Sequence, residues 1–300
     1  MTDLTQKTGF IALVGRPNVG KSTLLNTLLE EKIAAVSRKP QTTRTSITGI
    51  LTKGSRQYVF LDTPGVHKPK TKLGDMMMKS VGNATTDVCL VLLVVEPLAE
   101  IHPIERELLE KFQKMHVPVI LLINKTDIYS PEEIIRTIDV FSKAFPLEAV
   151  IPLSGKTGDG VEIIFQEAEP FLEEAPWFFP SDMITDQPER TIAAEIIREK
   201  LLKLLDKEIP HGIAVVIEDF KESEKRIDIR AEIFCEKASH KKIVIGKDGS
   251  MLKKVGSFAR EDLEAFFNTH VSINLWVKVK ENWRDDERLL NSFGFKPSDQ

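Results

Sequence analysis

The sequence predicts an α/β domain built on a mostly parallel sheet, followed by a smaller α+β domain. Three observations support this prediction. The chain of 300 residues is long enough for about two domains. In the first half, short apolar runs end in polar loops, as buried parallel strands do. Beyond residue 190, strands with alternating polar and apolar residues replace them.

The composition is typical of a soluble globular protein, with 42% hydrophobic and 29% charged residues. The longest apolar run, 88–95, is far shorter than the roughly 20 residues of a membrane span. The N-terminus lacks the basic and apolar pattern of a signal peptide, so we expect a cytoplasmic protein. Cys89 and Cys235 are expected to be buried thiols in a reducing compartment.

The first motif is G-R-P-N-V-G-K-S at 15–22, between an apolar strand at 10–14 and a helical stretch at 23–30. It matches the phosphate-binding loop G-x-x-x-x-G-K-[ST]. Glycines let the backbone curl so that its N–H groups face phosphate oxygens, the lysine reaches the β- and γ-phosphates, and the serine hydroxyl binds Mg²⁺. The predicted phosphate-binding residues are Gly15, Asn18, Val19, Gly20, Lys21, Ser22 and Thr23.

A second motif, D-T-P-G, follows the predicted strand 57–61. Asp62 at the end of this strand is a candidate for the Mg²⁺ site, because Mg²⁺ takes few carboxylates and keeps several waters. Gly65 can offer its backbone N–H to the γ-phosphate. The next residue is Val66, where many nucleotide switches have a glutamine that orients the attacking water.

The base is predicted from two further loops. The strand at 119–123 opens onto Asn124, Lys125 and Asp127, and the strand near 150–153 onto Ser154, Gly155 and Lys156. A carboxylate at Asp127 can accept the N1–H and N2–H of guanine, whereas adenine would leave it unpaired. The alternative for N-K-T-D alone is a polar loop. Because N-K-T-D follows the two phosphate motifs along the chain, we expect GTP and GDP as ligands.

Two polar stretches lie where the effector segments of such a switch belong, at 39–46 and 66–75. Thr43 is the candidate hydroxyl that closes on Mg²⁺ and the γ-phosphate, and Thr42 is the alternative. The predicted metal ligands are therefore Ser22, Thr43 and Asp62, and the predicted catalytic groups are Lys21, Thr43 and Gly65. Both stretches should become ordered with GTP and relax after hydrolysis.

A proline-rich linker at 173–189 precedes the second domain. A helix is predicted at 190–205, strands at 213–220 and 226–234, a helix pair around 244–267, and a strand at 271–279. Gly246 and Gly249 frame a G-x-x-G loop within a window, 237–260, that has seven basic residues and one acidic residue. Residues 190–300 carry 21 basic and 20 acidic residues, against 20 and 25 in residues 1–189.

This order of elements resembles the type II K-homology (KH) domain, in which a G-x-x-G loop binds about four nucleotides of single-stranded RNA. The alternative is a helix–helix turn with solvated lysines. The residues predicted to bind RNA are Lys242, Ile245, Gly246, Lys247, Asp248, Gly249 and Lys253. The helix after Gly249 and the strand at 271–279 are the predicted binding face.

When the motifs of both predicted domains are taken together, the chain resembles the Era family of bacterial GTPases over nearly its whole length. The resemblance implies a P-loop GTPase domain with a mostly parallel six-stranded sheet at 1–172, a linker at 173–189 and a KH domain at 190–300. It also implies binding to 16S rRNA near its 3′ end, a role in assembly of the small (30S) ribosomal subunit, and some peripheral contact with the inner membrane. No DNA partner is expected. Gly155 departs from the alanine more common in the family.

The resemblance also implies slow GTP hydrolysis without an activator, since relatives carry an apolar residue where Val66 stands. Asn18 matches the asparagine through which some relatives bind K⁺. His67 is interpreted as a solvated loop residue rather than a catalytic base. Two rival hypotheses remain: an RNA-binding scaffold with a vestigial nucleotide domain, and a membrane or cell-division regulator that meets anionic lipid through Lys68, Lys70 and Lys72.

Overall fold

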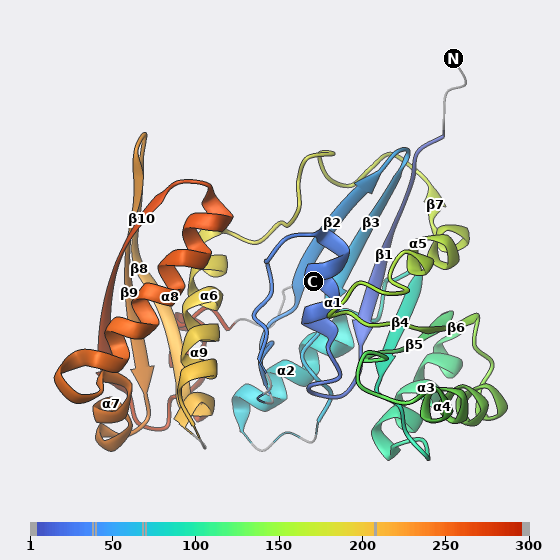
Figure 1. Ribbon diagram of the computed structural model, residues 1–300, viewed down its shortest axis with the longest axis horizontal. Coiled ribbons are helices and arrows are strands. Elements are labelled where there is room, and N and C mark those ends of the chain that lie inside the picture. Colours follow the sequence, from blue (N-terminus) through green and yellow to red (C-terminus); the bar gives the residue numbers. More distant parts are fainter. Residues whose placement is uncertain are drawn as a thin grey trace. The chain divides into compact units, whose positions relative to one another are not determined.

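The computed structural model describes residues 5–37, 39, 41–67, 69, 71–206 and 209–295. The chain divides into two compact units, shown in Figure 1. The first comprises Met1–Ile33, Thr43–Lys68 and Met77–Asp186. The second comprises Ala34–Thr42, Pro69–Met76 and Gln187–Gln300. The second unit therefore contains two short stretches from the region that the sequence assigns to the nucleotide domain.

The first unit is an α/β domain around a mostly parallel sheet. In the described residues the sheet runs β2-β3-β1-β4-β5-β6, with only β2 antiparallel along this path, and the two-residue β7 pairs antiparallel with β1. The predicted fold class is confirmed. The elements, with part of α2 in the second unit, are β1 Lys7–Val14, α1 Lys21–Leu29, β2 Ile47–Lys53, β3 Arg56–Asp62, α2 Lys72–Asn83, β4 Leu90–Val95, α3 Pro103–Met115, β5 Val119–Ile123, α4 Pro131–Ala144, β6 Ala149–Pro152, α5 Ile163–Ala168, a 3-10 turn Glu169–Phe171 and β7 Glu173–Glu174.

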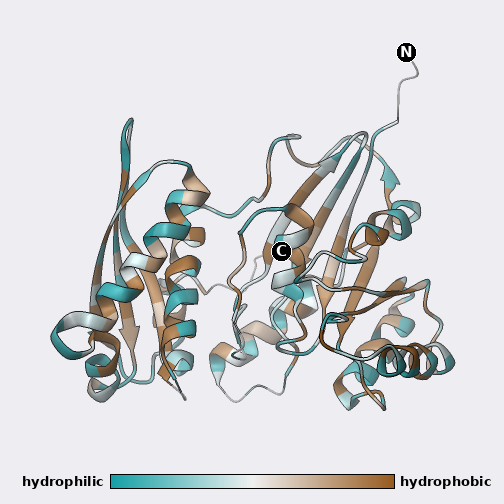
Figure 2. Ribbon diagram, viewed as in Figure 1, coloured by the Kyte–Doolittle hydropathy of each residue, from teal (hydrophilic) through white to brown (hydrophobic). Residues whose placement is uncertain are grey.

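The core of this unit lies on both faces of the sheet. All six residues of β4 are buried, as expected for a central parallel strand, and the strands are largely brown in the hydropathy view of Figure 2. One face is covered by α2, α3 and α4, through residues such as Val81, Phe112 and Phe141. On the other face α1 approaches β2 closely at Gly49, where a Cβ would lie 2.7 Å from Leu25.

The proline-rich stretch after β7 packs against the first unit. The buried Gln57 side chain accepts a hydrogen bond from the Phe179 N–H at 3.1 Å and donates to its carbonyl at 2.8 Å. The Ile50 N–H donates to the Ile184 carbonyl at 2.8 Å. These bonds explain why the first unit extends to Asp186, well into the predicted linker.

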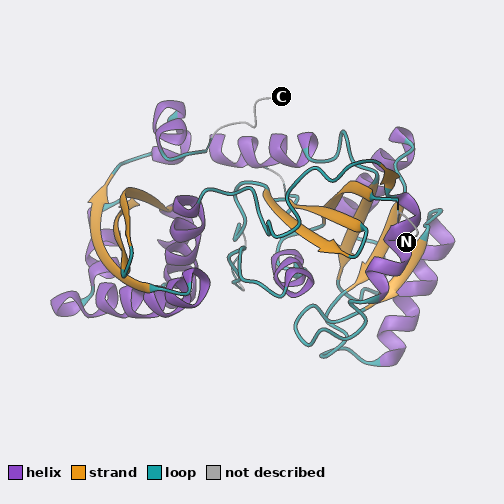
Figure 3. Cartoon of the chain, turned by 90° about the horizontal axis from the view of Figure 1, so that it is seen from above, coloured by secondary structure: helices purple, strands orange, loops and turns teal. Residues whose placement is uncertain are grey.

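The second unit is the predicted α+β domain. Its sheet has the order β10-β9-β8, with β8 antiparallel and β10 parallel to β9. Helices α6 and α8 lie along one face of this sheet, as Figure 3 shows, and enclose a core that includes Ile197, Ile229 and Val255. The elements are α6 Glu189–Leu204, a 3-10 turn Ile209–Gly212, β8 Ile213–Ser223, β9 Arg226–Cys235, α7 Ala238–Ile245, a 3-10 turn Lys247–Gly249, α8 Ser250–Phe267, β10 His270–Val279, a 3-10 turn Trp283–Asp285 and α9 Glu287–Ser292.

Candidate functional site

The phosphate-binding loop connects the end of β1 to the start of α1. A Cβ on Gly15 would lie 2.3 Å from the Val94 carbonyl oxygen, and a Cβ on Gly20 would lie 2.3 Å from Asn124 Nδ2. Both positions therefore need glycine because neighbouring atoms fill the space. Ser22 and Thr23 lie in the first turn of α1, where backbone N–H groups lack helical partners and can face an anion.

Lys21 lies inside this loop and is almost fully buried. Its ammonium donates hydrogen bonds to the carbonyls of Gly15 and Arg16, both at 3.0 Å. Burial lowers the pKa of Lys21 from 10.5 to about 8, and the nearby Asp62 carboxylate partly offsets this effect. A phosphate in the loop would give this ammonium a counter-charge.

Three predicted metal ligands meet at the end of β3. The Ser22 hydroxyl donates to Asp62 Oδ2 at 2.6 Å and lies 2.7 Å from the Thr43 hydroxyl. Thr43 also donates to Asp62 Oδ2 at 3.3 Å. The Thr42 hydroxyl instead donates to the Lys39 carbonyl at 2.7 Å, so the structure brings Thr43 rather than Thr42 to this cluster.

The environment of Asp62 fits a cation. Its side chain is fully buried, and Oδ1 has no hydrogen-bond partner in the described part of the chain. Burial raises the pKa of Asp62 from 3.8 to about 6, although Lys21 and the Ser22 and Thr43 hydroxyls act in the opposite direction. One carboxylate beside two hydroxyls is a donor set that suits Mg²⁺, which takes hard oxygen ligands and keeps water.

The turn after Asp62 packs on the phosphate-binding loop. A Cβ on Gly65 would lie 2.7 Å from backbone atoms of Pro17, and the Val66 N–H donates to the Gly15 carbonyl at 3.1 Å. The Val66 side chain packs against the apolar core between the sheet and α2, α3 and α4. His67 Nδ1 lies 2.8 Å from the Gly65 carbonyl oxygen. This geometry gives Val66 a packing role.

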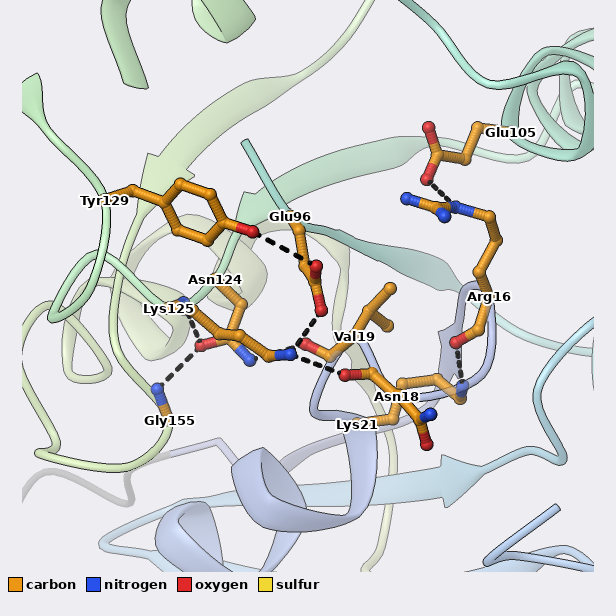
Figure 4. A network of polar contacts seen from close by, with 10 residues as sticks. All are labelled: Arg16, Asn18, Val19, Lys21, Glu96, Glu105, Asn124, Lys125, Tyr129 and Gly155. Carbon is orange, nitrogen blue, oxygen red and sulfur yellow. Dashed lines mark hydrogen bonds and ion pairs between the residues drawn. The ribbon is translucent and has the colours of Figure 1, made fainter. Parts of the chain in front are cut away.

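Asn124 joins the three loops of the predicted nucleotide site, as Figure 4 shows. Its Nδ2 donates to the Val19 carbonyl at 2.8 Å, and its Oδ1 accepts the N–H groups of Lys125 and Gly155, each at 2.8 Å. Gly155 also packs on α1, since a Cβ there would lie 3.2 Å from the Leu24 Cα. In this conformation the Gly155 N–H orders the loop through its bond to Asn124.

The carboxylate of Asp127 is oriented by the neighbouring loop. Ser154 Oγ donates to Asp127 Oδ1 at 2.8 Å, and Lys156 Nζ lies 3.7 Å from Oδ2. The Ser154 hydroxyl also accepts the Thr157 N–H at 3.2 Å. The two base-recognition motifs predicted from the sequence are therefore adjacent.

The sequence reasoning missed two anchors of this site, both visible in Figure 4. Lys125 Nζ donates to the Asn18 carbonyl at 2.7 Å and is ion-paired with Glu96, whose other oxygen accepts the Tyr129 hydroxyl at 3.3 Å. The second anchor is the pair of Arg16 and Glu105, in which Arg16 Nε donates to the fully buried carboxylate at 2.6 Å. Glu96 directly follows β4, and polar residues at strand ends face ligands in such sheets, a signal that could have found it.

In the second unit, the G-x-x-G loop joins α7 to α8. Gly246 and Gly249 have φ of 76° and 75°, and a Cβ on Gly246 would lie 2.7 Å from the Met251 N. Asp248 between them also has a left-handed φ of 52°. The loop ends at the N-terminus of the 18-residue α8, where no side chain caps the helix. Backbone N–H groups there can meet a phosphate.

Around this loop the predicted side chains split into two groups. Lys242, Lys247, Asp248 and Lys253 are exposed, whereas Ile245 packs against the core. Two large apolar side chains missed by the sequence reasoning are also exposed nearby in the sequence, Ile243 at 48% and Phe258 at 39%. Of the two, Phe258 is aromatic, and an exposed aromatic ring beside lysines is typical of surfaces on which nucleobases stack.

One of the three lysines predicted to meet anionic lipid, Lys72, lies in the described part of the chain. Lys68 and Lys70 lie outside the described residues, and Lys72 is ion-paired with Glu287 at 3.2 Å. No helix in the described ranges is both long and apolar enough to span a membrane.

Comparison with known proteins gives matches to both units. A family model described as "50S ribosome-binding GTPase" matches residues 10–125, and one described as "KH domain" matches residues 208–284. The chain is 46% identical to the GTPase Era of Ruminiclostridium cellulolyticum over 98% of its own length and 99% of that relative's.

Two solved structures are also similar. One is Era in complex with MgGDPNP and nucleotides 1506–1542 of 16S ribosomal RNA, with a TM-score of 0.92, 36% identity, and coverage of 97% of this chain and 99% of that one. The other is a variant of Aquifex aeolicus Era bound to GDP and AlF4⁻, with a TM-score of 0.93 at the same identity and coverage.

Proposed function

The chain belongs to the GTPase Era family, and from this premise we propose that it binds and hydrolyses GTP, binds 16S rRNA near its 3′ end, and acts in assembly of the small ribosomal subunit. The part of this proposal that concerns nucleotide binding rests on the position of Asn124. One amide fixes the phosphate-binding loop and both base-recognition loops relative to one another. Such a pre-ordered site suits a guanine nucleotide, since Asp127 is oriented by Ser154 to accept the two guanine donors.

In this proposal Ser22, Thr43 and Asp62 hold Mg²⁺, which neutralises charge that develops on the phosphates during transfer. Asp62 supplies a buried negative charge to the site, and the two hydroxyls supply further oxygen donors. Lys21 supplies a positive charge from inside the loop and Gly65 a backbone N–H. The chain's own residues thus provide electrostatic stabilisation and positioning, which dominate phosphoryl transfer.

Val66 offers no hydrogen bond to the attacking water, so unaided hydrolysis should be slow. We extend the proposal to K⁺ at Asn18, whose side chain is exposed at the turn of the loop and whose carbonyl already accepts Lys125. A bound monovalent cation would add positive charge near the phosphates. Equal GTP turnover in matched NaCl and KCl buffers would exclude this part of the proposal.

The RNA half rests on the G-x-x-G loop. Its glycines allow close approach of a backbone, and the exposed Lys242, Lys247 and Lys253 surround it with positive charge. The small subunit is the proposed partner because the relative bound to 16S rRNA covers 97% of this chain. The family model whose description names the 50S subunit matches only residues 10–125, a range that does not include the G-x-x-G loop.

The test is GTP hydrolysis by the purified chain, with and without an RNA that spans the 3′ end of 16S rRNA. Acceleration by this RNA, absent with a scrambled RNA of equal length, is the expected result. Bound RNA without acceleration would mean that hydrolysis is an internal timer and that the activator lies elsewhere. Absence of guanine nucleotide turnover in all conditions would instead favour the scaffold hypothesis.

A further inference from the structure

Two successive peptide groups of the phosphate-binding loop are held by side chains of the N-K-T-D motif. Lys125 Nζ donates to the Asn18 carbonyl at 2.7 Å, and Asn124 Nδ2 donates to the Val19 carbonyl at 2.8 Å. The C=O and N–H of a trans peptide point in opposite directions. Lys125 therefore turns the Val19 N–H away from itself, and Asn124 does the same for the Gly20 N–H.

The backbone conformation at these positions suits the binding of an anion. Asn18 and Gly20, on either side of Val19, have left-handed φ values of 66° and 102°. Left-handed residues in such a loop turn successive N–H groups to one side, which makes a concave site for phosphate. Asn18 is not a glycine, so this conformation is strained. The bond from Lys125 to the Asn18 carbonyl helps to hold it.

Glu96 in turn holds the side chain of Lys125. It directly follows β4, whose six residues are all buried, so a central strand fixes its backbone. Its carboxylate is ion-paired with Lys125 Nζ, and Oε2 accepts the Tyr129 hydroxyl at 3.3 Å. Figure 4 shows the resulting row from Tyr129 through Glu96 and Lys125 to Asn18. All four residues belong to the first unit.

The pair of Glu96 and Lys125 restricts a side chain that is otherwise flexible. Lysine has a four-carbon stem and a strongly hydrated ammonium, so a single bond to a carbonyl leaves it free to exchange with water. The two side chains are only 24% and 31% exposed, which shields their attraction in part from solvent. The carboxylate therefore keeps the ammonium beside the Asn18 carbonyl.

We propose that Glu96 is a positioning residue for nucleotide binding and that it acts through Lys125. By keeping the ammonium on the Asn18 carbonyl, it keeps the Val19 N–H directed at the phosphates. The inference rests on the proposed function, in which this loop binds GTP and GDP. A phosphate-binding loop cradles the α- and β-phosphates, which both nucleotides carry. The loss of Glu96 should therefore weaken both nucleotides by a similar factor.

The first test measures dissociation of GDP and of a non-hydrolysable GTP analogue from the full chain in the presence of Mg²⁺. Glu96→Ala removes both acceptor oxygens. We expect both nucleotides to dissociate about tenfold faster, the effect of one lost hydrogen bond to a charged group. The unfolding midpoint of the nucleotide-free chain should stay near wild type, because partly exposed ion pairs contribute little to stability.

The second test observes the loop directly, through the amide signals of the GDP-bound chain labelled with ¹⁵N. The Val19 amide proton should resonate at low field, because a hydrogen bond to an anionic oxygen deshields it, and Glu96→Ala should move it toward the ordinary amide range. The Gly20 amide is an internal control: Asn124 orients it, so its signal should stay in place.

A matched control and a double-mutant cycle complete the design. Glu169→Ala makes the same change at a glutamate that is ion-paired with Arg56 at 2.6 Å, at the end of β3 opposite Asp62. It should leave the dissociation rates and both amide signals unchanged. Lys125→Met keeps the stem of the lysine and removes its ammonium. If Glu96 acts through Lys125, Glu96→Ala has no further effect in that background.

Three results would each overturn the inference and leave the proposed function intact. They are unchanged dissociation rates in Glu96→Ala, a Gly20 signal that moves as far as that of Val19, and a full additional loss in the Lys125→Met background. A wild-type chain that binds no guanine nucleotide would overturn the proposed function first, and this inference with it.

Discussion

Replacing Asp62 by asparagine should stabilise the nucleotide-free chain at neutral pH. Asp62 is fully buried, and its pKa is raised to about 6 because burial disfavours the charged form. At pH 7 the folded chain therefore keeps a charge in a poorly solvated place, whereas the unfolded chain exposes it to water. Asparagine has nearly the same shape and no charge.

The magnitude follows from the pKa shift. The folded value of about 6 lies roughly two units above the ordinary 3.8, and each unit corresponds to about 1.4 kcal/mol, which gives about 3 kcal/mol at pH 7. This value already includes the opposing attraction of Lys21, but the asparagine amide adds N–H donors that need partners in the buried site, which returns part of the gain. We therefore expect a net stabilisation of about 1–3 kcal/mol.

The pH dependence of stability tests separately whether the Asp62 charge destabilises the fold. Between about pH 4 and pH 6 the folded wild type binds a proton that the unfolded chain has lost, so stability falls as pH rises through this window. The loss of stability reaches its full size above the pKa of Asp62 in the folded chain and disappears below its pKa in the unfolded chain. The stability gap between Asp62→Asn and wild type should therefore open from pH 4 to pH 7.

The assay is urea unfolding of both proteins without nucleotide or Mg²⁺ at several pH values, with Asp87→Asn as a control for loss of an exposed carboxylate. Asp62→Asn should also abolish Mg²⁺-dependent binding of a GTP analogue. A variant less stable than wild type at pH 7, or a gap that does not change with pH, would refute the reasoning.

Three further predictions concern single positions. Asp127→Asn should weaken GDP binding at least 10²-fold and improve binding of xanthosine diphosphate, because the amide can donate to the xanthine O2. Calorimetry that shows no change of preference from GDP to xanthosine diphosphate would contradict this prediction. Val66→Gln should not accelerate GTP hydrolysis, and should lower the free energy of unfolding by about 1–2 kcal/mol, because Val66 packs against the core; faster turnover would show that the position faces the attacking water. Lys247→Ala should weaken binding of all RNA sequences alike and reduce the slope of log affinity against log salt by about 1; a sequence-dependent loss would instead indicate base readout.

The sequence predicted best where backbone chemistry restricts the residue. Gly15, Gly20 and Gly246 are needed because a Cβ would strike neighbouring atoms, and such constraints leave fixed spacings in a motif. Asn124 was predicted from the N-K-T-D motif as a residue of the nucleotide site, and in the structure its amide bonds the phosphate-binding loop. The choice between Thr42 and Thr43 stayed open, because the direction of a side chain in an irregular loop leaves no pattern.

Contacts between distant residues were not predictable in the same way. The pairs Arg16–Glu105 and Lys125–Glu96 join residues that no spacing rule connects. The prolines after β7 indicated a linker, but their neighbours pair with Gln57, whose partners could be known only from the fold. Local sequence reports what a backbone tolerates and says little about which surfaces meet.

Helix α6 shows this limit most clearly. Its sequence predicts an amphipathic helix, which would normally expose its charged face to water. Instead Arg198, Glu199 and Lys200 are all buried, and the two residues Arg198 and Glu199 bind backbone groups of 34–42. A charged face that is buried must find partners, and here they come from a stretch more than 150 residues earlier in the chain.

The buried charges of the nucleotide site have a common consequence. Lys21 and Asp62 have pKa values moved toward neutrality, one down and one up, because burial disfavours both charged forms and their mutual attraction does not compensate fully. A magnesium-bound nucleotide would offer each of them an opposite charge. The instability of the free site is then part of the binding free energy, so nucleotide binding and folding are linked. A core without these charges would be more stable and would respond less to GTP.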